Sequence, residues 1–496
     1  MALTKVTYSM IEGSPANVLD FGADPTGVVD STLAFQNAVN AASNVYVPSG
    51  SYLINASRIL PMPGAKCGVQ LPSGCTVTLD ADAELNVIPS AESNSAIFGS
   101  YDTSLVTVIG GLFHGDRTGH TGVTQFCHGI DFRGVDRGRI TGSFVRNCVG
   151  DGIYLGAGAT GTFCDNIVVD SVDSNNNFRN GLSVVAANNV TITNSTFRNT
   201  NGVTPEAGID IETNSISLAN TNIKITECSF ISNIGTGVDI LRGQSVVVSD
   251  SYFYDNRSGH TLAGSAGGAA TKNVKIVNNT YENCSYSMLE LRDNLDDILI
   301  EGNTCYPLML AANGIIHCAV SPTTTNRMKI VNNIFYSTKT SGLATFSYSF
   351  SDVLTDVDFR GNTVFMGDGM QVWDWRGLNL LCENNTFNII SALASSTAIS
   401  FIQVGRVRIN NNLFNNATTT AQTIISSIND IVVGPNNSFS QYFTNSNINT
   451  AAPTGGYWTR GEKIYSSAPS ASGFIGFVCT TAGTPGTWKT FGPISA

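Results

Sequence analysis

Four acidic residues lie close together in the chain and could carry acid–base chemistry. Glu206, Asp210 and Glu212 fall within "PEAGIDIET", residues 205–213, and Asp239 lies in "GVDI", residues 237–240. Neighbouring carboxyl groups can differ in pKa, so that one donates a proton while another accepts one or attacks as a nucleophile. We expect these four acids to be catalytic if the fold brings them together. For any single acid, the alternative is a solvated position on a strand.

Alternation of residue types indicates which way the acids point. Ile209 and Ile211 alternate with Asp210 and Glu212, so a strand would turn the isoleucines inward and the acids outward to solvent. Similar segments begin at residues 152, 181, 237 and 288: "GIYL", "GLSV", "GVDI" and "MLEL". Aligning these segments predicts one outward column, which contains Tyr154, Ser183, Asp210, Asp239 and Glu290.

A sequence repeat explains why distant segments should align. Segments such as "NVTITNSTF" and "NVKIVNNTY" recur from residue 189 onward, each with two alternating apolar positions, a polar turn and another apolar residue. The first apolar positions run from Val190 to Val407, so eight steps cover 217 residues, a mean of about 27. They are Val190, Ile223, Val246, Val274, Ile298, Met328, Val357, Leu380 and Val407.

An asparagine column selects the architecture. One asparagine returns two residues before the last apolar position of successive repeats, at Asn279, Asn303, Asn333, Asn362, Asn385, Asn412 and Asn437. Identical amides can bond to one another when backbones stack about 4.8 Å apart, as in parallel strands in register. We therefore predict an all-β chain that forms a right-handed, single-stranded parallel β-helix. A β-sandwich, the alternative, would use antiparallel hairpins of shorter period.

The ends of the chain interrupt the repeat. Asp30 or Ser31 is expected to cap a short helix whose Phe35, Ala38, Val39 and Ala42 share one face, after which "VYVPSGSYLI", residues 45–54, begins the strands. We predict a short attachment segment over residues 1–16, the capped β-helix over 17–445 and a small β module over 446–496.

Composition excludes some functions. The net charge of −11 argues against binding nucleic acid, and the sequence contains neither an apolar run for membrane insertion nor a visible signal peptide, so we expect folding in a cytoplasm. The 11 cysteines lack paired spacing and are expected to be reduced, with Cys305 and Cys382 in the core. We expect no cofactor and no metal.

"NVLDFGADPTGVVDSTLAFQNAV", residues 17–39, resembles the entry motif of the pectate-lyase-like β-helix superfamily as it occurs in bacteriophage tailspikes. The terminal "WTRGEKIYSSAPSASGFIGFVCTTAGTPGTWKTFG" is similar to a segment of phage receptor-binding proteins. The resemblance implies a homotrimer in the virion, at the phage tail, that contacts other tail or baseplate proteins. It also implies binding and depolymerisation of bacterial surface polysaccharide, either capsule or O-antigen.

This resemblance makes glycosidic bond hydrolysis by an endo-acting enzyme the first functional hypothesis, with Glu206, Asp210, Glu212 and Asp239 as catalytic candidates. Two alternatives remain open: a polysaccharide lyase acting by β-elimination, and a receptor-binding spike without catalysis. In the coil between Asp239 and Glu290, the glycine-rich "TLAGSAGGAA" predicts a notch for one sugar.

Substrate-binding candidates surround this notch and extend beyond it. They are Arg242, Glu290, Arg292, Trp373 and Trp375. The two tryptophans could equally lie at a trimer interface.

Overall fold

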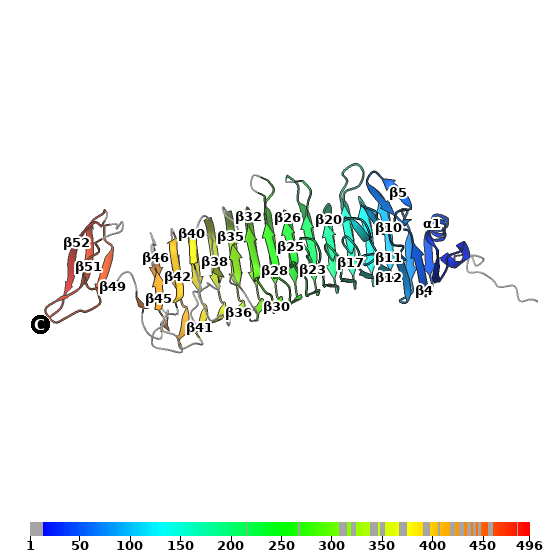
Figure 1. Ribbon diagram of the computed structural model, residues 1–496. Coiled ribbons are helices and arrows are strands. Elements are labelled where there is room, and N and C mark those ends of the chain that lie inside the picture. Colours follow the sequence, from blue (N-terminus) through cyan, green and yellow to red (C-terminus); the bar gives the residue numbers. More distant parts are fainter. Residues whose placement is uncertain are drawn as a thin grey trace, which may run out of the picture.

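The protein winds into a long parallel β-helix, seen as a rod of stacked coils in Figure 1. The computed structural model describes residues 13–215, 217–265, 268–306, 315–318, 324–337, 346–347, 353–366, 374–389, 397–404, 407–416, 422–425, 431–433, 438–439, 443–444, 448–454, 460–483 and 485–496. Over these residues, three long sheets contain 19, 16 and 11 strands, which we call sheets 1, 2 and 3. Between residues 44 and 347, each coil passes through sheet 1, then sheet 2, then sheet 3, and its strands pair in parallel with those of the next coil; the later β-helix strands belong to sheets 1 and 2.

Sheet 1 consists of β1 (Ala16–Asn17), β3 (Asn44–Val47), β8 (Thr76–Leu79), β11 (Ser104–Ile109), β14 (Asp136–Thr141), β17 (Cys164–Asp170), β20 (Ala187–Thr193), β23 (Asn220–Thr226), β26 (Gly243–Ser249), β29 (Thr271–Val277), β32 (Leu295–Glu301), β35 (Thr324–Val331), β38 (Val353–Arg360), β40 (Asp374–Glu383), β42 (Thr397–Val404), β43 (Val407–Asn410), β45 (Gln422–Ile425), β46 (Ile431–Val433) and β48 (Phe443–Thr444). Sheet 2 consists of β2 (Thr26–Asp30), β4 (Gly50–Ile54), β9 (Ala83–Val87), β12 (Leu112–His114), β15 (Phe144–Arg146), β18 (Asp173–Asn175), β21 (Thr196–Arg198), β24 (Ser229–Ile231), β27 (Tyr252–Tyr254), β30 (Thr280–Glu282), β33 (Thr304–Cys305), β36 (Ile334–Ser337), β39 (Thr363–Met366), β41 (Thr386–Ile389), β44 (Leu413–Asn416) and β47 (Ser438–Phe439). Sheet 3 consists of β7 (Val69–Gln70), β10 (Ser95–Tyr101), β13 (Cys127–Arg133), β16 (Ile153–Gly156), β19 (Leu182–Val184), β22 (Ile209–Glu212), β25 (Thr236–Leu241), β28 (Ser258–Ala263), β31 (Ser287–Arg292), β34 (Ile316–Cys318) and β37 (Phe346–Ser347).

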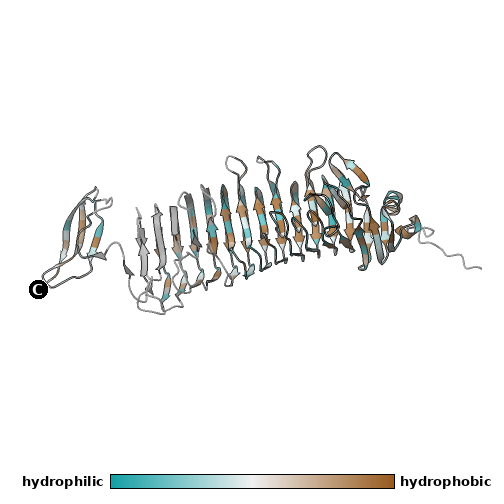
Figure 2. Cartoon of the chain, viewed as in Figure 1, coloured by the Kyte–Doolittle hydropathy of each residue, from teal (hydrophilic) through white to brown (hydrophobic). Residues whose placement is uncertain are grey.

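Alternating side chains build the core. The first apolar position of each repeat from Val190 to Leu380 is at most 4% exposed, and apolar and polar residues alternate along the strands in Figure 2. The rings of Phe197, Phe230, Phe253 and Tyr281 stack on successive coils at centroid distances of 5.7, 4.6 and 4.8 Å. Cys305 and Cys382 are buried and free, as predicted.

The predicted asparagine column forms a buried ladder. The side-chain amide of Asn279 donates to the Oδ1 atom of Asn303 at 3.1 Å, and the same bond joins each next pair through Asn412 at 2.9–3.1 Å. The residue just before each ladder asparagine, such as Asn278 or Asn332, has the left-handed backbone conformation that the turn requires. Asn437 lies outside the described residues.

At the N-terminal end, helix α1 (Thr32–Ala41) covers the first coil and buries Phe35, Ala38 and Val39. Its first turn is capped by Asp30, whose Oδ1 atom accepts from the Thr32 N–H at 2.9 Å. The prediction that strands begin after this helix was wrong. β1 and β2 precede it, because β2 adds to the edge of β4 and extends sheet 2 by one strand.

Other elements lie outside the three sheets. The turn η2 (Val18–Phe21) precedes β2, and β5 (Ile59–Met62) pairs with β6 (Ala65–Cys67) as an antiparallel hairpin. Near the C-terminus, β49 (Ile448–Asn449), β50 (Lys463–Ser466), β51 (Phe474–Thr481) and β52 (Thr487–Pro493) form a four-stranded sheet. In the part of the chain that the structure describes, no helix is long and apolar enough to cross a bilayer.

Candidate active site

The outer face of sheet 3 carries a column of polar side chains in strict register. Tyr154, Ser183, Asp210 and Asp239 are paired on consecutive strands, followed by Thr261, Glu290 and His317. A glycine begins most of these segments because the coils approach closely there. A Cβ atom on Gly208 would lie 2.6 Å from the carbonyl oxygen of Gly237. We call this run of side chains the acid column.

Asp210 lies on the outer face but is hidden from solvent, with 1% of its surface exposed. Its Oδ2 atom accepts from the Asn180 amide at 3.1 Å and lies 3.5 Å from the Arg179 guanidinium. The expectation that alternation alone would expose Asp210 was therefore wrong, because these two side chains cover it. Burial, and then the neighbouring Asp239 carboxylate, raises the pKa of Asp210 well above its ordinary value.

Asp239 is the partly exposed member of the acidic pair. Burial raises its pKa to about 7, opposed by the charge of Arg292 and reinforced by the charges of Glu212 and Glu290. Among the described residues no cation forms an ion pair with Asp239, whereas Asp210 has Arg179 and Glu290 has Arg292. A carboxyl group with these properties holds a proton near neutral pH while it remains open to solvent.

Glu212 continues β22 at the edge of the acid column. Its side chain is 39% exposed, and its Oε1 atom lies 3.5 Å from the guanidinium of Arg242. Arg242 is itself buried. It donates to Thr213 and, at 2.8 Å, to the Ser265 hydroxyl. Arg242 therefore fixes the loop beneath Glu212 and leaves the outer side of this carboxylate open.

Glu290 is buried under two arginines. It accepts from the Arg257 guanidinium at 3.0 Å and from Arg292 at 2.6 and 2.9 Å. The Arg257 side chain is 37% exposed and the Arg292 side chain 41% exposed, while that of Glu290 is only 1% exposed. Arg292 thus lies beside the acid column, and Glu290 serves to hold the two arginines in place.

In the described residues, which leave out 266 and 267 of the glycine-rich segment, no glycine lies between Asp239 and Glu290 where the notch was predicted. The register places Thr261 of β28 between them, and this threonine is 3% exposed. Gly264 follows β28, outside the strand, and donates through its N–H to the Asp293 carbonyl at 2.6 Å. The prediction failed because the alignment assigned the glycines to the strand, while the strand is formed by the preceding "SGHTLA".

Glu206 lies in the loop that enters β22. Its Oε1 atom accepts from the Gly202 N–H at 2.6 Å, and its carbonyl accepts from the Gly235 N–H at 3.0 Å. The carboxylate therefore stabilises its own loop. Gly235 makes this contact possible, because a Cβ atom there would lie 1.9 Å from the carbonyl oxygen of Pro205.

One of the two tryptophan candidates falls within the described residues. Trp373 lies outside the described residues. The backbone of Trp375 belongs to β40 in sheet 1, where it pairs with Phe401 of β42. The acids belong to sheet 3.

Three neighbours of the acid column, His128, Asp151 and Arg179, were not singled out in the sequence. Asp151 is buried, with a pKa raised by burial to about 6, and it lies 3.2 Å from the Arg179 guanidinium that also faces Asp210. The ring of His128 lies 3.5 Å from Asp151, and burial holds its pKa well below the ordinary value. The sequence did contain a sign of Asp151 and Arg179. Polar residues stand directly before the strand glycine in "DGIYL" and "RNGLSV".

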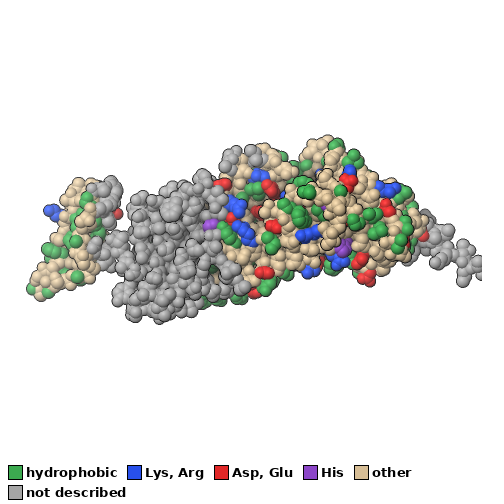
Figure 3. All heavy atoms as spheres, in the orientation of Figure 1, with side chains coloured by type: hydrophobic (Ala, Val, Ile, Leu, Met, Phe, Trp, Pro, Cys, Tyr) green, Lys and Arg blue, Asp and Glu red, His purple; other side chains and the backbone are tan. Residues whose placement is uncertain are grey.

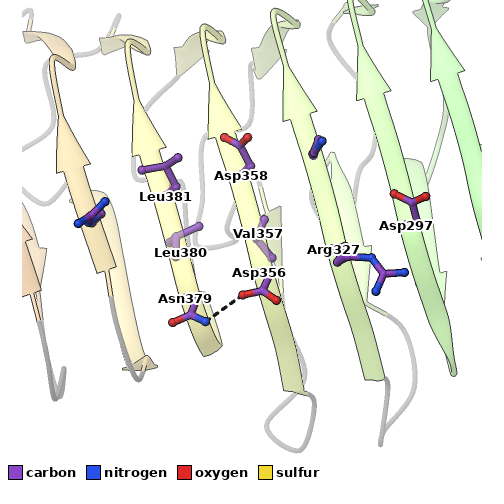
Figure 4. A pocket seen from close by; sticks show the side chains of 10 residues that line it. Asp297, Arg327, Asp356, Val357, Asp358, Asn379, Leu380 and Leu381 are labelled. Carbon is purple, nitrogen blue, oxygen red and sulfur yellow. Dashed lines mark hydrogen bonds between the residues drawn. The ribbon is translucent and has the colours of Figure 1, made fainter.

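A surface hollow lies on sheet 1, apart from the acid column, and has a volume of about 580 Å³. Figure 4 shows Asp356 and Asp358 on one of its strands and Arg327 on another. Two of its polar residues have side-chain partners: Asp356 accepts from Asn379 at 2.9 Å, and Arg327 pairs with Asp296, outside the hollow, at 2.6 Å. The face drawn in Figure 3 has acidic and basic side chains side by side over the middle of the rod.

Comparisons with known proteins agree with this architecture. Residues 44–245 and 214–387 match the family described as right handed beta helix region, and residues 16–62 match rhamnogalacturonase A/epimerase, pectate lyase-like. The uncharacterized protein YclG of Bacillus subtilis (strain 168) is 23% identical over 262 residues, 48% of this chain and 45% of its own length. The chain spans less than half the length of the curated relatives that it matches.

Solved structures of low identity share the fold. The N-terminal fragment of bacteriophage phi29 gene product 12 has a TM-score of 0.54 at 13% identity, covering 84% of this chain and 70% of the fragment. The tailspike of E. coli bacteriophage HK620, solved in complex with a pentasaccharide, has a TM-score of 0.51 at 14% identity, covering 87% and 83%. The resemblance to the pectate-lyase-like superfamily and to the tailspike fold is confirmed. The chain belongs to the family of right-handed parallel β-helix proteins.

Proposed function

We propose that this protein hydrolyses a bacterial surface polysaccharide as an endo-acting depolymerase of the tailspike type. The observation that carries the proposal is the pairing of a partly exposed Asp239, with a pKa of about 7, and a solvent-open Glu212 on one face. Glycoside hydrolysis requires one protonated and one ionised carboxyl group on either side of the bond. The tailspike structure that contains a pentasaccharide supports the substrate class.

We assign the general acid to Asp239 and the general base to Glu212. Asp210 pairs directly with Asp239 and is too buried to reach a sugar, so we assign it no direct part in proton transfer. Glu212 is diagonal to Asp239, one strand across and two residues along, which corresponds to about 8 Å between Cα atoms. Both side chains project from the same face, so this backbone spacing favours the separation of about 6.5–9.5 Å between carboxyl groups that leaves room for a water molecule, and we expect inversion at the anomeric carbon.

Incubation with purified capsular polysaccharides and O-antigens tests the proposal. We expect shortening by size-exclusion chromatography, release of reducing ends, and inverted anomeric configuration in NMR spectra. Asp239→Asn and Glu212→Gln should each lower kcat by about 10²–10⁴-fold, since each removes one proton-transfer group. The exposed Asp82→Asn is the matched control. Full activity of both site variants would refute the assignment.

One observation favours a lyase as the second candidate. Residues 16–62 match a family that is described as pectate lyase-like. A lyase would give products that absorb in the ultraviolet as unsaturated sugars, without dependence on Glu212. Binding with no shortening would instead identify a receptor-binding spike.

We further propose that the protein acts as a homotrimer on a phage tail, in contact with other tail or baseplate proteins. The rings of Tyr306, Tyr336 and Phe365 stack on the outer side of sheet 2 at 5.5 and 4.6 Å. Tyr336 is stacked on both faces, so its apolar edge remains for a protein partner rather than a sugar. Light scattering after size-exclusion chromatography measures the mass, and a monomer would contradict the trimer.

A further inference from the structure

Arg257 and Arg292 form a pair of cations whose positive charge is only partly balanced by a neighbouring carboxylate. The two guanidinium groups share a single carboxylate, that of Glu290, which is buried beneath them. Both guanidinium groups reach solvent, and each carries more N–H donors than its contacts with Glu290 use. The cluster therefore presents an excess of positive charge and of donors on its outer side.

The surroundings preserve this excess. Burial lowers the pKa of His317, so this ring adds no charge at neutral pH. Asp239, two strands away and about 10 Å distant in backbone spacing, holds a proton below pH 7. The protein as a whole is acidic, with a net charge of −11, so long-range electrostatics would repel an anion and only a local cationic site could bind one.

The geometry of the two arginines is fixed in advance. Arg257 stacks on the ring of Tyr286 at 4.1 Å, and the Glu290 carboxylate fixes the Arg292 fork by two hydrogen bonds. A planar guanidinium held in this way suits a planar carboxylate, which it can bind through two parallel bonds. A neutral sugar offers hydroxyl groups, which would leave the excess charge without a partner.

We propose that Arg257 and Arg292 bind the carboxylate of a sugar acid, so that the polysaccharide is an anionic polymer of uronic or related acids. This inference rests on the proposed function, because it places the polymer along the acid column. The carboxylate-bearing unit lies two strands from Asp239, and the bond that is cleaved lies between that unit and the coil of Glu212. The site recognises charge and takes no part in proton transfer.

Binding measurements on an array of purified bacterial polysaccharides, half of them with sugar acids and half neutral, test this inference. We expect binding to acidic polymers. Reduction of their carboxyl groups to alcohols should weaken binding about 10–100-fold, the loss expected for a charge-assisted pair. Arg292→Gln should weaken binding of the acidic polymer to the same extent and leave binding of its reduced form unchanged.

Matched variants separate recognition from folding. Arg257→Gln combined with Glu290→Gln leaves no unpaired buried charge, and we expect it to fold and to lose discrimination against the reduced polymer. Arg292→Lys keeps the charge beside Glu290 but not the planar fork, so an intermediate loss is expected. Arg327→Gln, an exposed arginine on sheet 1, should bind like the unaltered protein.

The outcomes distinguish this inference from the proposed hydrolysis. Equal binding of native and carboxyl-reduced polymers, binding of neutral polymers only, or no binding at all would overturn the anionic site. Shortening of a neutral polymer would preserve the hydrolase and refute the anionic site. Tight, carboxylate-dependent binding without shortening of the polymer would preserve the anionic site and refute the hydrolase.

Discussion

Replacement of Asp239 by asparagine should stabilise the protein at alkaline pH while it removes activity. An asparagine resembles the protonated carboxyl group in shape and cannot ionise. The folded structure favours the protonated form of Asp239, because burial raises its pKa from 3.8 to about 7 and Glu212 and Glu290 add like charge. The variant therefore keeps the form that folding prefers at every pH.

The sign and size follow from the two pKa values. Below about pH 4 the carboxyl group is protonated in both the folded and unfolded chains, so the substitution changes little. Between pH 4 and pH 7 the unfolded chain loses its proton and the folded chain keeps it, so native stability falls as pH rises. At 1.36 kcal/mol for each pH unit, the full difference above pH 7 is about 4 kcal/mol in favour of the variant.

Hydrogen exchange measures this difference where it arises, since a solenoid opens coil by coil. Peptides that cover β25, residues 236–241, should exchange about a thousandfold more slowly in Asp239→Asn than in the unaltered protein at pH 8, after correction for the intrinsic rate. At pH 4 the two should agree, and peptides that cover β11 should agree at both pH values. Equal protection of β25 at pH 8 would refute the reasoning, and Asp82→Asn serves as the control.

Three further predictions concern residues that support the site. Asn333→Leu removes one step of the buried ladder, and the side-chain amide and backbone N–H of Asn303 lose the oxygen to which both donate. The free energy of unfolding, measured by urea titration, should therefore fall by about 3–5 kcal/mol. A loss below about 1 kcal/mol would contradict the ladder's role. Gly235→Ala drives a methyl group against Pro205, and should lower kcat without changing the acids; activity equal to that of the unaltered protein would show that the loop can move aside. Arg179→Gln removes the cation that faces two buried aspartates, and should raise the pKa of Asp151 above its value of about 6, with a loss of stability that is larger at pH 8 than at pH 5; carboxyl NMR titration checks the first and thermal unfolding the second.

Much of the architecture was readable in the sequence, because a β-helix repeats one local pattern. The apolar positions, the asparagine ladder from Asn279 to Asn412 and the capping helix all follow from residue type at a fixed period. The register of Asp210 beside Asp239 was predictable for the same reason, since a glycine and two apolar residues mark each strand. Trp375 could not be assigned to a sheet in this way, because its segment lacks those marks.

Burial, ion pairing and proton affinity were decided by the tertiary structure. Whether Asp210 meets solvent depends on Arg179 and Asn180, which the turn of the previous coil places over it. The strand register also places Thr261, and not a glycine, between Asp239 and Glu290, because β28 ends before the glycine-rich loop begins. Sequence alternation determines which side of a strand a residue faces, but pKa and access depend on what the other coils bring to that side, because electrostatic interaction depends on distance in space and not along the chain.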